Sequence, residues 1–327
     1  MGRPQKKIIR IPRTLVQWPF PRRINPHYQE AKYASQSWIE SFRAFEPRAQ
    51  DAFNRCDFAH LRVGCDLINL FFVVDEFSDL QSADVVRSQV DIVLDALRNP
   101  HKPRPAGEWV GGEITRQFWE RAIVDASDVM QRRFLKSFGD YLESVVDQAR
   151  DRDCRHVRDI DGYMEVRRKN IGCRPLLALM LLEEDIPEEI FDLPLIEEMT
   201  RIAIDVITLS NDMYSYNREQ SQDDADHNFV TVVMHSVGMN LARAMAFTGR
   251  RHEQLAAEFV KLWEDSKNDP ACMQPSVQRY IESIGNLVRT NDQWSFESQR
   301  YFGRHGLEVK RTRIVPLLEK RPAVKEH

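Results

Sequence analysis

The chain lacks several features that would assign it to common classes of protein. Its cysteines are few, widely spaced and without a CxxC pair: Cys56, Cys65, Cys154, Cys173 and Cys272. Neither a disulfide framework nor a zinc site is therefore indicated, and a reducing compartment fits. No apolar stretch approaches the roughly 20 residues that a helix needs to cross a bilayer, and the N-terminus has no apolar signal-peptide core. We expect a cytoplasmic protein.

The chain also lacks a large charge of one sign. Its formal net charge of -4 over 327 residues argues against non-specific binding to nucleic acid. Basic residues nevertheless gather in the two terminal segments, 1–30 and 306–327. We expect these segments either to be solvated tails or to fold over an anionic ligand at the active site.

Signals for β-strands are equally scarce. Apolar residues instead recur at helical spacing, as at Val86, Val90, Val93 and Leu97, and again from Phe118 to Val145. Breaks fall at 99–112, 185–194 and 220–228, and neither a repeat nor a proline-rich linker divides the chain. We predict an all-α protein in which residues 1–327 form a single domain.

One predicted helix contains a break of its own. Gly172 and Pro175 interrupt an otherwise helical stretch from about residue 160 to residue 182. Such a break either accommodates packing or bends the chain so that backbone carbonyls become exposed. The residues alone leave both interpretations open.

Two carboxylates follow the apolar run 67–74. Asp75 and Asp79 are four residues apart, so on a helix they point in one direction, with Phe71 and Phe72 directly below them. Two like charges repel each other and resist burial beside aromatic rings, so a cation between them would relieve both costs. A divalent metal ion is the natural candidate.

A second set of polar side chains follows the apolar run 202–209. Asn211, Ser215 and Glu219 are each four residues apart and form a column of oxygen atoms on one helix face. All-oxygen ligation with one negative charge suits Mg²⁺ that shares its other positions with water and phosphate. Either motif alone is typical of a solvated helix face, but each closes an apolar helix, and the two could face each other across a bundle.

These motifs resemble those of class I terpene synthases, and specifically of the fungal sesquiterpene cyclases. Residues 75–79 look like the family's aspartate-rich motif in its DExxD form, and residues 211–219 match its NDxxSxxxE metal motif in full. Residues 294–302 carry Arg300 and Tyr301, which resemble the pair that binds diphosphate in the family.

Further stretches are similar to the basidiomycete members of the family. Residues 18–28 and 52–57 resemble the group that includes the Δ6-protoilludene synthases. The resemblance implies a class I terpenoid synthase bundle of helices around an apolar cavity. It implies Mg²⁺-dependent cyclisation of farnesyl diphosphate to a sesquiterpene hydrocarbon, with 1,11 ring closure as in that group. We expect a monomer or weak homodimer that inserts stably into no membrane.

The resemblance also assigns roles to individual residues. It implies three Mg²⁺ ions, held by Asp75, Asp79, Asn211, Ser215 and Glu219. It implies diphosphate contacts from Arg168, Arg218, Arg300 and Tyr301. Gly172 looks like the family's effector glycine, whose carbonyl would face the nascent cation. Counted from Gly172, the resemblance implies Arg168 rather than Arg167 as the diphosphate sensor. Phe71, Phe72 and Trp294 would either face the cation or belong to the core.

One segment common in the basidiomycete group is missing. Residues 55–60 run directly into residues 61–66, where relatives usually carry about fifteen further residues, or roughly four helical turns. This apparent deletion between Phe58 and Leu61 would remove part of a helix beside the pocket, which could open the cavity wall or leave core surface exposed. The alternative to an active cyclase is therefore an impaired homologue that binds prenyl diphosphate without cyclising it.

Other enzymes that share parts of this pattern fit less well. A prenyl chain-elongating synthase would carry a second aspartate-rich motif at 211–219, and a class II cyclase would need DxDD, which the chain lacks. A di-iron bundle needs ExxH pairs, but none of the nine histidines lies three residues after a glutamate.

Overall fold

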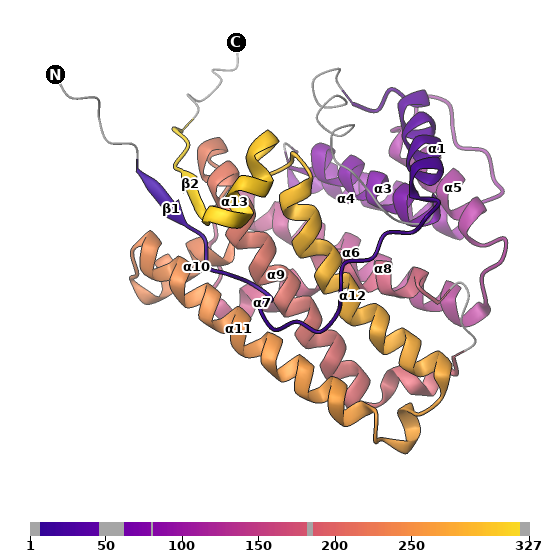
Figure 1. Ribbon diagram of the computed structural model, residues 1–327. Coiled ribbons are helices and arrows are strands. Elements are labelled where there is room, and N and C mark those ends of the chain that lie inside the picture. Colours follow the sequence, from indigo (N-terminus) through magenta and orange to yellow (C-terminus); the bar gives the residue numbers. More distant parts are fainter. Residues whose placement is uncertain (1–6, 46–61, 80, 182–185, 321–327) are drawn as a thin grey trace, which may run out of the picture.

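The computed structural model describes residues 7–45, 62–79, 81–181 and 186–320. Almost all regular structure in these ranges is helical (Figure 1). The α-helices are α1 (Tyr28–Ser41), α3 (Arg62–Ser78), α4 (Ala83–Arg98), α5 (Gly111–Ala122), α6 (Asp128–Asp153), α7 (Ile160–Asn170), α8 (Cys173–Leu179), α9 (Pro194–Gln222), α10 (Phe229–Val237), α11 (Leu241–Ser266), α12 (Pro275–Glu297) and α13 (Gly306–Thr312). The predicted all-α class is confirmed.

Two short strands lie near the two ends of the described part of the chain, where the sequence shows no strand signal. Strand β1 (Ile8–Arg10) pairs antiparallel with β2 (Ile314–Pro316), and Ile9 lies opposite Val315. Strands of three residues are too short to show the alternation that reveals a strand in a sequence. The pairing holds the two ends of the described chain side by side (Figure 1).

The helix boundaries follow most of the breaks that the sequence predicts. The periodicity from Phe118 to Val145, however, does not form one segment but the two helices α5 and α6. Ser127 begins the second helix, because its side-chain oxygen accepts a hydrogen bond from the N–H of Met130 at 3.2 Å. An N-cap can therefore interrupt a helical pattern without glycine or proline.

Helix α9 is the central element of the bundle. It spans 29 residues, and its apolar run 202–209 is buried between neighbouring helices. It packs against α11 and α12 along much of its length, and α7 and α10 also contact it (Figure 1). A helix covered on several sides presents few side chains to water, so the polar residues at its C-terminal end face either the core or a cavity.

The segment between β1 and α1 is packed on the bundle. Pro12 occupies the space where a Cβ on Gly249 of α11 would lie, only 2.5 Å away, and Phe20 does the same at Gly285 of α12, at 2.4 Å. The indole N–H of Trp18 donates to the carbonyl of Gly285 at 3.0 Å. These contacts lead the chain across α12 toward α1 (Figure 1).

The stretch from 55 to 61, where the missing segment would belong, lies outside the described residues. Within the described ranges, no helix combines the length and apolar character that crossing a bilayer requires.

Candidate active site

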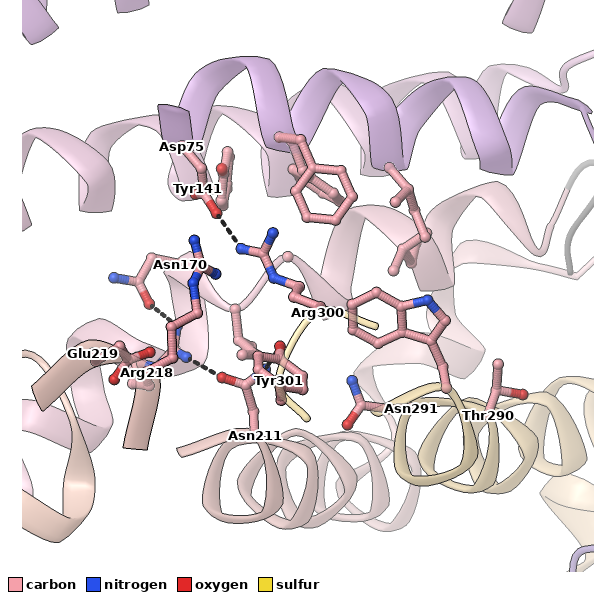
Figure 2. A pocket seen from close by; sticks show the side chains of 18 of the residues that line it. Asp75, Tyr141, Asn170, Asn211, Arg218, Glu219, Thr290, Asn291, Arg300 and Tyr301 are labelled. Atoms are coloured by element: carbon pink, nitrogen blue, oxygen red, sulfur yellow. Dashed lines mark hydrogen bonds and ion pairs between the residues drawn. The ribbon is translucent and has the colours of Figure 1, made fainter. Parts of the chain in front are cut away.

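A cavity of about 680 Å³ lies among α3, α6, α7, α9 and α12. Its wall includes both acidic motifs, several arginines, and the aromatic side chains of α3 and α12. Figure 2 shows Asp75 on one side of this space, Asn211 and Glu219 on the other, and Arg218, Arg300 and Tyr301 between them. The motifs that the sequence suggested could face each other are thus brought to one cavity.

The first acidic motif lies at the C-terminal end of α3. Asp75 is in the last turn, and Asp79 follows the helix, with its N–H still bonded to the carbonyl of Asp75 at 2.9 Å. Both residues line the cavity. The Asp75 side chain has a relative accessibility of 49%, and this surface faces the cavity.

The environment of these two acids disfavours negative charge. Burial raises the pKa of Asp75, although Arg300 and Arg167 act in the opposite direction. Burial raises the pKa of Asp79 to about 8, and the nearby carboxylates of Asp75 and Asp224 add to the shift. A bound cation would reverse this balance, because it stabilises the charged form of both acids.

The second motif extends along the C-terminal part of α9. Asn211 and Glu219 line the cavity, and Ser215 is buried on the same face between them. The amide oxygen of Asn211 accepts a hydrogen bond from Arg167 at 3.0 Å, and its nitrogen donates to the hydroxyl of Tyr301 at 2.9 Å. Burial, with the charge of Asp212, raises the pKa of Glu219 to about 7.

The donor atoms of the two motifs fit Mg²⁺. Asp75, Asp79, Asn211, Ser215 and Glu219 offer carboxylate, amide and hydroxyl oxygens, which are the ligands that Mg²⁺ prefers. Burial raises the pKa of Asp75, Asp79 and Glu219, and a cation bound among them would stabilise their charged forms. Within the described residues, no three acidic, histidine or cysteine side chains already form a metal cluster.

Basic and phenolic groups lie between the two acidic walls. A guanidinium nitrogen of Arg300 is 3.9 Å from a carboxylate oxygen of Asp75, and the same group lies over the ring of Phe72, 4.5 Å from its centroid. Burial, together with the charge of Arg300, lowers the pKa of Arg218. Two arginines held close together in a buried place favour an anion such as diphosphate.

The structure separates the neighbouring arginines of α7. Arg167 lines the cavity and donates to Asn170 and Asn211 at 3.0 Å each and to Asp212 at 3.1 Å. Arg168 does not line the cavity and forms a two-pronged pair with Asp205, at 2.7 and 2.9 Å. The structure thus places Arg167 at the cavity and Arg168 away from it, whereas the role of Arg168 as diphosphate sensor stays a prediction.

Gly172 lies at the break between α7 and α8 and lines the cavity. Its φ of +75° is a conformation that side chains disfavour, and an added Cβ would be 2.9 Å from the ring of Phe71. Its carbonyl oxygen is 3.5 Å from the N–H of Leu176. Glycine is thus required both by the bend and by the close approach of an aromatic ring.

Aromatic side chains cover part of the cavity wall. Phe71, Phe72 and Trp294 all line it. The ring of Phe71 packs edge-on against Tyr141, with centroids 4.8 Å apart, and Tyr141 stacks on Phe138 at 5.5 Å. This wall can hold a hydrophobic chain and offer ring faces to positive charge.

The two basic terminal segments differ in their relation to the cavity. Arg22 and Arg23 line it, and Arg22 also pairs with Glu297 of α12 at 2.8 Å. In the described part of the C-terminal segment, up to residue 320, no side chain lines the cavity. This segment packs along α9, where the Asn217 amide donates to the carbonyl of Pro316 at 2.9 Å.

Sequence reasoning missed Asp212, the aspartate of the second motif. It is buried and accepts hydrogen bonds from the hydroxyl of Tyr163 at 2.5 Å, from Arg167 at 3.1 Å and from the N–H of Phe229 at 2.9 Å. Its position soon after the apolar run 202–209 was a usable signal, because a buried carboxylate requires donors. It serves to join α7, α9 and α10 behind the column of possible metal ligands.

The chain is similar to known proteins over nearly its whole length. Residues 66–258 match the family described as terpene synthase family 2, C-terminal metal binding. A Δ6-protoilludene synthase of Stereum hirsutum is 48% identical over 328 residues, covering 96% of this chain and 89% of the relative. One of Armillaria gallica is 47% identical and covers 95% and 94%. Sesquiterpene synthase 14 of Postia placenta is 44% identical and covers 97% and 94%.

Solved structures agree on the fold. An α-eudesmol synthase has a TM-score of 0.76 at 19% identity, covering 86% of this chain and 98% of that chain. A hedycaryol synthase in complex with HEPES has a TM-score of 0.73 at 21% identity, covering 88% and 98%. The family match, the close relatives and the fold lead to one conclusion: the chain belongs to the terpene synthase family.

Proposed function

We propose that the chain is a sesquiterpene synthase, which ionises farnesyl diphosphate with Mg²⁺, cyclises the resulting cation and releases a proton from it to give a hydrocarbon. The observation that carries this proposal is the composition of one cavity of about 680 Å³. Two acidic oxygen-bearing walls face each other across buried arginines, next to a wall of aromatic rings. Ionisation of farnesyl diphosphate gives a diphosphate anion and a hydrophobic carbocation. The acidic walls and arginines suit the anion with its metal ions, and the aromatic wall suits the carbocation.

The names of close relatives support the class of substrate and product. Relatives that are 44 to 48% identical are named sesquiterpene synthases or Δ6-protoilludene synthases. We therefore propose a product of the Δ6-protoilludene type, formed by 1,11 ring closure. We also retain one domain over residues 1–327 and a monomer or weak homodimer as predictions.

Mg²⁺ would be held by Asp75 and Asp79 on one wall and by Asn211, Ser215 and Glu219 on the other, with three ions as the expected number. When bound, the metal supplies positive charge that stabilises the diphosphate as it leaves. The donor set and the raised pKa values of Asp79 and Glu219 support this assignment.

The protein's own contribution to ionisation is to bind and orient the diphosphate. Arg218 and Arg300 supply fixed charge, Tyr301 supplies a hydroxyl donor, and Arg167 takes the role first assigned to Arg168. Donors already placed where negative charge develops lower the barrier, because they need little reorganisation during the reaction. The allylic cation is left in the part of the cavity lined by aromatic rings.

The cavity wall must then protect the cation from water. Phe71, Phe72 and Trp294 offer ring faces that attract positive charge without reacting with it. Arg22 and Arg23 of the N-terminal segment lie at the same cavity, so we propose that this segment helps to close it after the diphosphate binds. Closure excludes the water that would convert the cation to an alcohol.

Incubation of the purified protein with farnesyl diphosphate and Mg²⁺, followed by gas chromatography and mass spectrometry, tests the proposal. We expect one dominant sesquiterpene hydrocarbon, and strong loss of it in Asp75→Ala and Asn211→Ala. A folded protein that binds diphosphate but releases no hydrocarbon above a boiled control would instead be the impaired homologue. Unchanged turnover in both variants would refute the metal assignment.

A further inference from the structure

Asn228 lies at the end of the loop between α9 and α10 and is completely buried. Its side-chain oxygen accepts a hydrogen bond from the N–H of Val230 at 2.9 Å, which makes it the N-cap of α10. This bond uses only the acceptor of the amide. The donor side of the same group points to α9.

The amide nitrogen of Asn228 contacts α9 at successive turns. It donates to the carbonyl oxygen of Asp212 at 2.9 Å and to a carboxylate oxygen of Glu219 at 2.8 Å, and the hydroxyl of Ser215 is 3.4 Å away. An NH₂ group has two hydrogens, so the two short bonds use its donor capacity fully. Reversing the amide would place its oxygen against a carbonyl and a carboxylate, so the orientation is determined by its neighbours.

These contacts matter most for Glu219. Glu219 lines the cavity, and one of its carboxylate oxygens accepts the short hydrogen bond from Asn228. Holding one oxygen of a carboxylate at 2.8 Å fixes the plane of the group. A metal ligand held in this way does not need to lose rotamer freedom when the metal binds.

We infer that Asn228 is a positioning residue for the metal column of α9, which fixes the carboxylate of Glu219 and supports the hydroxyl of Ser215. The inference rests on the proposed function, which makes these two residues Mg²⁺ ligands. It also assigns a role to the end of the loop, because the same side chain that begins α10 sets the geometry of the ligands on α9.

Helix capping alone would not require this residue. Serine or aspartate caps a helix as well as asparagine does, and neither provides an amide donor. Asn240 offers a comparison within the chain, since its side chain caps α11 by accepting from the N–H of Arg243 at 3.0 Å and is exposed. Asn240→Ser is therefore a matched control for Asn228→Ser.

The experiment measures the binding of Mn²⁺ together with inorganic diphosphate, by calorimetry and by the Mn²⁺ electron paramagnetic resonance signal. Both Asn228→Ser and Asn228→Asp keep a capping acceptor but lose the donor to Glu219. We expect each to bind Mn²⁺ and diphosphate roughly 10- to 100-fold more weakly, as for other residues that orient metal ligands. Asn240→Ser should bind like the wild type, and all variants should retain cooperative unfolding in urea.

Turnover with farnesyl diphosphate gives a second measurement. In the Asn228 variants, the Mg²⁺ concentration needed for half-maximal rate should rise by a larger factor than the maximal rate falls. Wild-type affinity in folded Asn228 variants would overturn the inference, and so would failure of both variants to fold, which would mark the residue as structural. If the wild type binds Mn²⁺ and diphosphate but makes no hydrocarbon, the proposed function fails while the positioning role is still judged. If it binds neither, both fail.

Discussion

The neighbouring arginines of α7 give the sharpest test of the site, because one change can be made at two adjacent positions. Arg167→Lys and Arg168→Lys both keep a positive charge but remove the planar guanidinium that can donate several hydrogen bonds at once. Arg167 uses that shape to reach Asn211 at 3.0 Å and Asp212 at 3.1 Å from inside the cavity. Arg168 uses it on Asp205, away from the cavity.

The expected effects differ in size. Losing one hydrogen bond between charged groups in the transition state costs about 1.5 to 3 kcal/mol, which corresponds to a rate reduced roughly 10- to 150-fold. We expect this loss in turnover for Arg167→Lys. For Arg168→Lys we expect turnover close to that of the wild type, because its pair with Asp205 lies away from the cavity. Asp205 also keeps its pair with Arg201 at 2.9 Å.

The assay is single-turnover conversion of farnesyl diphosphate at saturating Mg²⁺, which reports on ionisation and cyclisation without product release. Urea unfolding of each variant shows that the comparison concerns folded protein. A large loss in Arg168→Lys together with normal turnover in Arg167→Lys would refute the geometric argument and restore the choice made from the register to Gly172.

Three further predictions follow from buried groups. Burial lowers the pKa of His252 from its usual 6.5 to about 4, so the stability that the neutral ring contributes above pH 6.5 is lost as the pH falls toward 4. In urea unfolding, the wild type should therefore lose about 3 kcal/mol more than His252→Phe between pH 6.5 and pH 4. An equal pH dependence in both proteins would contradict this. Burial raises the pKa values of Glu219 and Asp79 to about 7 and about 8, so metal binding at lower pH must displace protons from them. Mg²⁺ with diphosphate should therefore raise the melting temperature more at pH 8.5 than at pH 6. A shift in melting temperature that does not depend on pH would argue against their role as ligands. Gly172→Ala should reduce the free energy of unfolding by about 1 to 3 kcal/mol, because the alanine would have to adopt a positive φ and its Cβ would lie 2.9 Å from the ring of Phe71. An unchanged urea midpoint would show that the ring moves without cost.

The acidic motifs could be predicted because their geometry is local. Asp75 and Asp79, like Asn211 and Glu219, are separated by multiples of four residues, and helical repeat alone places each set on one face. Whether the sets face one cavity depends on how α3 and α9 pack, which sequence spacing does not determine. The sequence indicated only that the two sets could face each other, and the structure places both at one cavity.

The choice between Arg167 and Arg168 could not be made from the sequence. Consecutive residues on a helix point about 100° apart, so the residue that faces the cavity depends on how α7 is rotated against its neighbours. Asn228 was missed for a related reason. Its contacts with α9 join residues 9 to 16 positions apart, through a loop that carries no periodic signal.

The packing of the N-terminal segment on α11 and α12 also bears on how the protein is made. Trp18 and Phe20 are buried against Gly285, more than 260 residues later in the chain. At ordinary translation rates, roughly 15 to 50 seconds separate the synthesis of these two regions. Throughout that interval the nascent chain exposes two aromatic side chains, because the helix that will bury them has not yet been synthesised. The yield of folded protein in a host cell should therefore depend on chaperones that bind hydrophobic segments of nascent chains.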